Sequence, residues 1–135
     1  MRKLSRKKSH RTSLIRNLAT SLILYESMET TLSKAKEVKG FVDTMLGKVK
    51  TDDLNTTKYL SSVLFDNNAV KKTLKELLPR YKSRTSGFVV VFKSGHRLGD
   101  SAATARVELI DKKTFTTEPA ITKKAVSKKV EKIST

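Results

Sequence analysis

The stretch FVVVFKSGHRLGDSAATARVEL, residues 88–109, decides the fold, because the hydrophobic pattern of the chain changes its period there. Residues 88–93 are β-branched and aromatic, and residues 105–109 alternate apolar and charged side chains, so both segments are typical of strands. The Gly-containing turn at residues 94–101 therefore predicts a two-stranded antiparallel hairpin. We expect Phe88 and Phe92 to pack in the core beside the neighbouring valines.

The chain before this hairpin has helical periodicity. Apolar residues recur at helical spacing in four segments, at residues 12–25, at 33–49, around Tyr59 to Leu64 with an end before Asp66, and at 68–78. Ser33 and Asn68 are expected to cap the second and fourth helices, and Ser9 or Thr12 the first. Thr51-Asp52-Asp53 is a start signal for the third helix. Pro79 disfavours helix at the residue before it and predicts the last helix end near Leu78.

The order of these elements predicts one α+β domain, with about four helices followed by the hairpin. Residues 26–32 (ESMETTL) are Thr-rich and break the helical period, so a short strand near residues 27–32 could join the hairpin. We expect three parts: a basic N-terminal arm at residues 1–11, an α+β core at 12–111 and a Lys-rich tail at 112–135.

The charge of the chain restricts its function. It holds 29 Lys and Arg against 13 Asp and Glu, a formal net charge of +16, which implies a polyanionic partner. The basic residues are concentrated: residues 1–16 hold seven and residues 80–97 hold five, without one acid in either segment. Residues 51–79 are neutral and predict a scaffold. The longest apolar run, residues 88–92, falls far short of the roughly 20 residues that span a membrane.

Enzyme chemistry has no support in the sequence. His10 and His96 have no carboxylate partner in a recognisable motif, and no nucleotide-binding loop, nucleophile motif or metal-ligand cluster is present. The chain has no cysteine, which removes disulfides and thiolate metal sites. We therefore expect no enzymatic activity, no cofactor, no metal and no small-molecule substrate.

Four blocks of residues resemble a known family in their order and spacing. They are Leu4–Arg6 followed by Ser9–Arg11 and Arg16–Asn17, then Thr30–Thr31 with Lys34–Glu37, then Arg80–Arg84 ahead of Gly87–Phe88, then Gly99–Asp100 before Val107–Leu109. Over residues 4–111 the chain resembles the family of large-ribosomal-subunit protein seventeen of bacteria and organelles. The resemblance implies an α+β fold whose basic N-terminus and loops bind large-subunit ribosomal RNA near the exit tunnel.

The sequence also departs from the family pattern. It has fewer residues before Leu4, which implies an arm of shorter reach. Ser86 stands where a second Gly is common, and Val89 and Val90 replace a strand start that often contains Arg. These changes weaken the inference of an RNA contact borne by that strand. The tail after Asp111 is not part of the common core, so the resemblance assigns it no role.

The residues expected to bind RNA carry basic, hydroxyl or amide groups. Lys and Arg displace counterions from phosphate, a helix N-terminus near His10 and Arg11 attracts anions, and Gly95 and Gly99 permit close backbone approach. For Thr30 and Thr31 an ordinary structural role in a strand is the alternative. The expected contacts are Arg2, Lys3, Arg6, Lys7, Lys8, His10, Arg11, Arg16, Asn17, Thr30, Thr31, Lys34, Lys36, Arg80, Lys82, Arg84, Lys93, His96 and Arg97.

These residues predict a structural constituent of the large ribosomal subunit that braces ribosomal RNA beside neighbouring ribosomal proteins. The expected location is cytoplasmic, or organellar. The charge also allows a nucleoid-type DNA-binding protein, or a binder of membrane surfaces or acidic proteins. The basic start could be a solvated tail or a mitochondrial leader. Against a leader, the motif positions Arg16, Asn17 and Thr30 lie on or just beyond the same helix, so cleavage would remove part of the fold.

Overall fold

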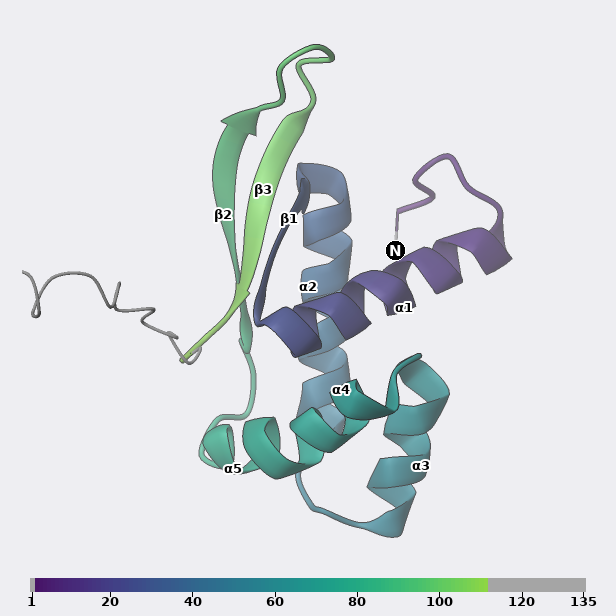
Figure 1. Cartoon of the computed structure of the whole chain (residues 1–135), viewed down its shortest axis with the longest axis vertical. Coiled ribbons are helices and arrows are strands. Elements are labelled where there is room, and N and C mark those ends of the chain that lie inside the picture. Colours follow the sequence, from purple (N-terminus) through teal and green to yellow (C-terminus); the bar gives the residue numbers. More distant parts are fainter. Residues whose placement is uncertain (1, 112–135) are drawn as a thin grey trace, which may run out of the picture.

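Three strands form an antiparallel sheet in the order β1-β3-β2, and helices pack against one of its faces (Figure 1). The computed structural model describes residues 2–111, so the predicted C-terminal tail lies outside the described residues. Its elements are α1 (Lys8–Tyr25), β1 (Ser27–Thr31), α2 (Leu32–Lys48), α3 (Leu54–Val63), α4 (Asn67–Lys72), a π-helical turn (Thr73–Leu77), α5 (Leu78–Arg80), β2 (Val89–His96) and β3 (Ala103–Leu109). The predicted α+β class and hairpin are confirmed, and β1 confirms the short additional strand.

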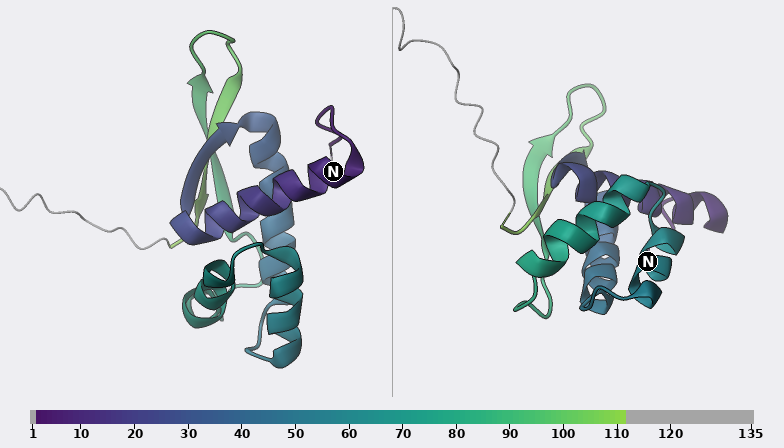
Figure 2. Two further views of the ribbon diagram at one scale, coloured as in Figure 1. Left: turned by 45° about the vertical axis from the view of Figure 1, so that its right-hand side comes forward. Right: turned by 60° about the horizontal axis from the view of Figure 1, so that its bottom comes forward.

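The sheet alternates buried and exposed residues along its central strand. Ala105, Val107 and Leu109 of β3 are buried, whereas Arg106 between them is exposed. Because side chains of a strand point to opposite faces in turn, the first three define the face that packs on α1 and α2. Helices α3 to α5 lie at the opposite end of the molecule from the hairpin tip, and both views in Figure 2 agree on this separation.

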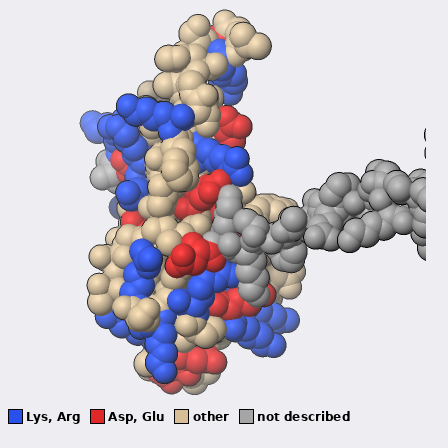
Figure 3. Space-filling model, turned by 90° about the vertical axis from the view of Figure 1, so that its left-hand side faces the viewer, with Lys and Arg blue, Asp and Glu red and all other residues tan. Residues whose placement is uncertain are grey.

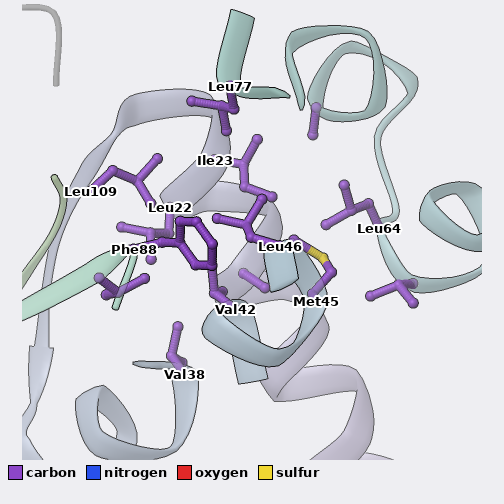
Figure 4. Close-up of a cluster of buried hydrophobic side chains, with 14 of the residues drawn as sticks. Leu22, Ile23, Val38, Val42, Met45, Leu46, Leu64, Leu77, Phe88 and Leu109 are labelled. Atoms are coloured by element: carbon purple, nitrogen blue, oxygen red, sulfur yellow. The ribbon is translucent and has the colours of Figure 1, made fainter. Parts of the chain in front are cut away.

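Phe88 lies in the centre of the core, where side chains from the helices and the sheet meet (Figure 4). Its ring contacts that of Tyr81 at a centroid separation of 5.2 Å and an interplanar angle of 59°, a favourable tilted geometry. The Asp43 carboxylate of α2 accepts hydrogen bonds from the N–H groups of Phe88 and Val89, at 2.8 and 3.1 Å. The start of β2 is therefore fixed by packing and by a charged acceptor.

The prediction for Phe92 was wrong, because this side chain is 53% exposed. In the sheet register Phe92 lies opposite Arg106, whereas Val91 lies opposite the buried Val107. Phe92 therefore projects from the face that no helix covers among residues 2–111. An apolar run does not reveal which of its two faces is buried, so periodicity could not separate Phe88 from Phe92.

Three of the expected helix starts were wrong. α1 begins at Lys8 with Lys7 as its N-cap, and α2 begins at Leu32 with Thr31 as its N-cap; neither cap side chain makes a capping hydrogen bond. α4 is capped by Asp66, whose carboxylate accepts from the Asn68 N–H group, so Asn68 is inside the helix. Lys and Arg are good helix formers, which explains why α1 extends into the predicted arm. The predicted start of α3 is confirmed, with Asp53 as the cap.

The last helical segment also continues past its predicted end. It runs through a π-helical turn into α5, which ends at Arg80 and contains Pro79 in its first turn. Pro has no N–H group, so it is tolerated where a helical turn starts afresh. The π turn provides this new start, since the Leu78 N–H group donates to the Thr73 carbonyl five residues earlier.

A buried cluster of charges joins the end of α1 to the last helical segments. Glu26 is 5% exposed and has a positive φ of 59° at the C-cap of α1. Its carboxylate accepts hydrogen bonds from both terminal guanidinium nitrogens of Arg80, at 2.9 and 3.2 Å, and lies 2.9 Å from the Lys72 ammonium group. The hydrogen bond with Glu26 is the main cause that raises the pKa of Arg80. This ion cluster ties α1, α4 and α5 together.

Candidate nucleic-acid interface

The N-terminal arm folds back toward the start of α1 instead of extending away from it (Figure 1). Leu4 and Ser5 have positive φ angles of 52° and 51°, and the Arg6 N–H group donates to the Lys3 carbonyl at 3.2 Å. Leu4 is partly buried against the core, and the Arg6 guanidinium donates to its carbonyl at 2.9 Å. This turn holds the arm's basic residues close to the N-terminal end of α1.

An open groove lies between the arm and α1, and we call it the arm groove. It is lined by Leu4, Ser5, Arg6, Lys7, Ser9 and His10. The first N–H groups of an α-helix have no partner within the helix, and they form the positive end of its dipole. No side chain caps α1, so these donors and several basic groups share one surface. Such a surface attracts phosphate.

The guanidinium groups of the arm have no acidic partner among residues 2–111. Each ion pair within that range lies elsewhere in the fold. The Nε atoms of Arg6 and Arg11 are buried without a hydrogen-bond acceptor. Arg2, Lys3, Lys7 and Lys8 are exposed. Of the predicted arm residues, Arg6, Lys7 and His10 line the arm groove, whereas Arg2, Lys3, Lys8 and Arg11 lie outside its lining.

A second open groove lies beside the hairpin tip, and we call it the tip groove. It is lined by Glu29, Thr30, Thr31, Lys34, Ser94, His96, Arg97, Leu98 and Thr104. The register explains this grouping, since Thr31 at the end of β1 lies opposite Thr104, which in turn lies opposite Gly95. α2 starts directly after β1 and brings Lys34 to the same place. Five of the predicted site residues therefore meet in one groove.

The turn of the hairpin is held in shape by a charged pair. Gly95 and Gly99 have positive φ angles of 114° and 102°, as their expected role requires. The Arg97 guanidinium donates to both oxygens of the Asp100 carboxylate, and the Ala102 N–H group adds a third hydrogen bond to it. The Arg97 side chain is the main cause that lowers the pKa of Asp100 to about 2. Two guanidinium nitrogens of Arg97 are thus engaged by Asp100 within the turn.

The basic residues at positions 80–84 do not join the tip groove. The eight residues of β2 separate this segment from the hairpin tip, a distance of roughly 25 Å at about 3.3 Å per residue. Arg80 is engaged by Glu26 in the ion cluster. Arg84 donates to the Gly87 carbonyl at 3.3 Å and lies 3.8 Å from the Asp111 carboxylate, while Lys82 is exposed. Closeness in sequence to His96 therefore does not mean closeness in space.

The remaining predicted residues lie between these places. Asn17 is exposed and Arg16 partly exposed on α1, Lys36 is exposed on α2, and Lys93 is exposed on β2. None of them lines either groove.

Sequence reasoning missed four residues that line the tip groove: Glu29, Ser94, Leu98 and Thr104. Leu98 is 99% exposed at the turn, and a large apolar residue within a Gly-flanked basic turn was the signal that could have found it. Ser94 occupies a shift in the register between Lys93 and Gly95, and Thr104 is placed by strand pairing, so neither has a signal in the sequence alone.

Residues 2–111 contain no group of three or more His, Asp or Glu side chains placed to hold a metal ion. Within the same residues, no helix is both long enough and apolar enough to cross a membrane.

The chain is similar in sequence to known proteins. Residues 14–110 match the family model described as Ribosomal protein L17. The chain is similar to the large ribosomal subunit protein bL17 of Endomicrobium trichonymphae, with 44% identity over 102 residues that cover 76% of this chain and 87% of the relative. It is also similar to the protein of that name from Orientia tsutsugamushi (strain Boryong), with 40% identity over 82% of this chain and 77% of the relative. The chain therefore belongs to the ribosomal protein L17 family.

Proposed function

We propose that this chain is a structural constituent of the large ribosomal subunit that braces large-subunit ribosomal RNA through the arm groove and the tip groove. The relatives that it resembles are named as large-subunit proteins. The observation that carries the RNA contact is the segregation of charge. Residues 2–16 hold seven Lys and Arg with no acid, around a helix start that no side chain caps. RNA phosphates are the polyanion that such a surface fits.

The two grooves are proposed to bind the RNA together. The arm lies at the N-terminal end of α1, the hairpin tip projects from the sheet, and the start of α2 lies between them (Figures 1 and 2). A rigid body that engages two segments of one RNA makes the second contact intramolecular, which raises its effective concentration. We expect recognition by RNA shape and backbone.

The test measures binding of purified large-subunit ribosomal RNA as a function of salt concentration. The arm variant replaces Arg6, Lys7, Lys8 and Arg11 with Ala, and the tip variant replaces Lys34, His96 and Arg97 with Ala. We expect the arm variant to bind more weakly and to lower the slope of log affinity against log salt by about 3, since each lost phosphate contact removes roughly 0.7 to 0.9. Far-ultraviolet circular dichroism of the free protein should stay largely unchanged.

A matched control removes four charges from the opposite end of the molecule. Lys50, Lys58, Lys71 and Lys75 are all exposed and line neither groove. Their joint replacement by Ala should alter the salt slope much less than the arm variant does. An equal loss in both would show that only net charge matters and would overturn the proposed grooves. Tighter binding to duplex DNA than to the RNA, with no sedimentation beside large subunits, would favour a nucleoid-type protein instead.

A further inference from the structure

The hairpin tip presents a large apolar side chain to solvent. Leu98 is 99% exposed, whereas the other exposed large apolar side chains among residues 2–111 are 53% to 74% exposed. It lies in the turn at the end of the hairpin that is farthest from helices α3 to α5 (Figures 1 and 2). Figure 3 shows this end as a projection made mainly of uncharged atoms, above a part of the surface that carries Lys and Arg atoms. Leu98 therefore contributes nothing to the core.

The turn that carries Leu98 is closed by hydrogen bonds on both sides of it. The Arg97 N–H group donates to the Ala102 carbonyl at 2.9 Å, and the Ser101 N–H group donates to the Arg97 carbonyl at 3.0 Å. The pair between Arg97 and Asp100 spans the same turn. A single exposed Leu is ordinary on a protein surface. One that a closed turn holds at the rim of a groove is preorganised for a contact.

The tip groove is basic only in its central part. Lys34 and Arg97 supply cations there, and Thr and Ser hydroxyl groups lie among them. Glu29 lines the same groove, and its carboxylate repels phosphate. Three residues of β3 separate the strand pair of Glu29 from that of His96, a distance of roughly 10 Å. Leu98 lies two residues beyond His96, so the groove has an acidic end, a cationic middle and an apolar end.

A fully paired RNA helix offers little to an exposed leucine. The bases of A-form RNA are stacked, its major groove is deep and narrow, and its shallow minor groove displays hydroxyl groups and base edges. The faces of bases are open only where nucleotides are unstacked, in loops, bulges and ends. Apolar side chains such as Leu contact nucleic acids by packing against bases that have been unstacked. An apolar apex beside cations therefore matches a nucleotide with an open base and anionic phosphates.

We propose that the hairpin tip engages an unpaired nucleotide of large-subunit RNA. Leu98 packs on the open face of its base, and Lys34 and Arg97 contact the adjoining phosphates. Asp100 uses two of the three guanidinium nitrogens of Arg97 and leaves the third, Nη1, for a phosphate. The arm groove has no comparable apex, because its apolar residue Leu4 is partly buried against the core. The inference rests on the proposed function and specifies which RNA structure the tip groove takes.

Salt-dependent binding of purified large-subunit RNA separates an apolar contact from a phosphate contact. Leu98→Ser should weaken binding about tenfold at every salt concentration, because it removes apolar contact surface without removing a cation. The tip variant, which loses Lys34, His96 and Arg97, should instead lower the slope of log affinity against log salt. Leu98→Met keeps apolar surface of similar volume and should bind like the unchanged protein.

The matched control for Leu98→Ser is Leu54→Ser. Leu54 is 66% exposed at the start of α3 and lines neither groove, so this substitution should leave the affinity for RNA unchanged. Circular dichroism should show that both free variants keep the fold. Equal affinities for the two serine variants would refute the contact. So would an equal loss in Leu98→Met and Leu98→Ser, because apolar surface would then not be what the RNA contacts.

Photocrosslinking in assembled particles identifies the nucleotide. The chain is produced in cells with benzoyl-phenylalanine in place of Leu98, and large subunits are isolated on a sucrose gradient before irradiation. We expect a nuclease-sensitive adduct whose attachment point, mapped by reverse transcription, is a nucleotide in a loop, bulge or junction. Chemical probing of the protein-free RNA should find the Watson–Crick edge of that nucleotide reactive, as expected of an unpaired base.

Three results of the cross-linking would overturn the inference. Attachment within a continuous duplex would show that the tip meets paired RNA. A nuclease-resistant adduct would show that a protein covers Leu98, and the absence of any adduct in sedimenting particles would show that nothing does. Each of these results leaves the proposed RNA binding by the basic residues intact. Failure of the unchanged chain to bind the RNA or to sediment with large subunits would count against the proposed function itself.

Discussion

The ion cluster around Glu26 provides the sharpest test of the structure, because it decides between two roles for Arg80. The sequence predicts that Arg80 contacts RNA, whereas the structure engages its guanidinium group with a carboxylate that is 5% exposed. Glu26→Gln removes the charge and keeps the size of the side chain. Arg80→Gln removes one cation and leaves Lys72 at 2.9 Å from the carboxylate.

The two substitutions should differ in their effect on stability. Removing one partner of a buried ion pair costs about 3 to 5 kcal/mol, because the other charge stays buried without compensation. Glu26→Gln leaves two cations, Arg80 and Lys72, without the carboxylate that compensates their charge. The side chains of Arg80 and Lys72 are 13% and 19% exposed, so we expect the lower end, about 3 kcal/mol. Arg80→Gln loses hydrogen bonds to a charge that Lys72 still neutralises and a contact with the Tyr81 ring at 6.0 Å, and we expect a cost of about 1.5 to 2 kcal/mol.

Urea denaturation followed by circular dichroism measures both free energies of unfolding, and the double variant completes a mutant cycle. We expect a coupling energy of about 1 kcal/mol or more between Glu26 and Arg80. Binding of ribosomal RNA by the folded Arg80→Gln variant should stay close to that of the unchanged protein. A stability loss in Arg80→Gln that exceeds the loss in Glu26→Gln would refute the reasoning. So would unchanged stability combined with weakened RNA binding.

Three further predictions concern the core, the start of β2 and the hairpin turn. Phe88→Ala should destabilise the fold by about 3 to 5 kcal/mol in urea denaturation, whereas Phe92→Ala should cost less than about 1 kcal/mol; equal losses would contradict the assigned faces of β2. Asp43→Ala should cost about 2 to 3 kcal/mol, because it leaves two backbone N–H groups at the start of β2 without their charged acceptor, and a change below about 0.5 kcal/mol would exclude that role. The pKa of the Asp100 carboxyl is lowered from 3.8 to about 2. The ionised carboxylate should therefore stabilise the turn fully at pH values above its ordinary pKa of 3.8, and this stabilisation should be lost as the pH falls through about 2. A nuclear magnetic resonance titration should find that midpoint, and Arg97→Gln should return it toward the ordinary value.

Local patterns in the sequence predicted most of the elements. The change of period at residue 88, the alternation at residues 105–109 and the Gly residues of the turn gave the hairpin, because strand and turn preferences depend on neighbouring residues. The helix starts were less accurate. Residues 8–11 contain no helix breaker, and the candidate caps Ser9 and Thr12 both lie inside α1, so no local signal separated a helical segment from an extended arm. The π turn before Pro79 had no recognisable signal.

The candidate site was predicted in its parts but not in its grouping. The arm residues adjoin each other in sequence, and three of them, Arg6, Lys7 and His10, line one groove. Thr30 and His96 are far apart in sequence and meet only because β1 and β2 both pair with β3. Arg80 and His96 are closer in sequence, yet the length of β2 separates them.

By itself, the sequence determined the α+β class, the basic N-terminal segment and the strongly positive charge, since each follows from composition or from contacts between near neighbours. Only the tertiary structure decided that Arg80 neutralises a buried carboxylate, that Phe92 faces solvent and that Glu29 and Glu108 share one face of the sheet with it. The physical reason is that strand register and helix packing choose the partner and the exposed face of each side chain, and both depend on residues distant along the chain.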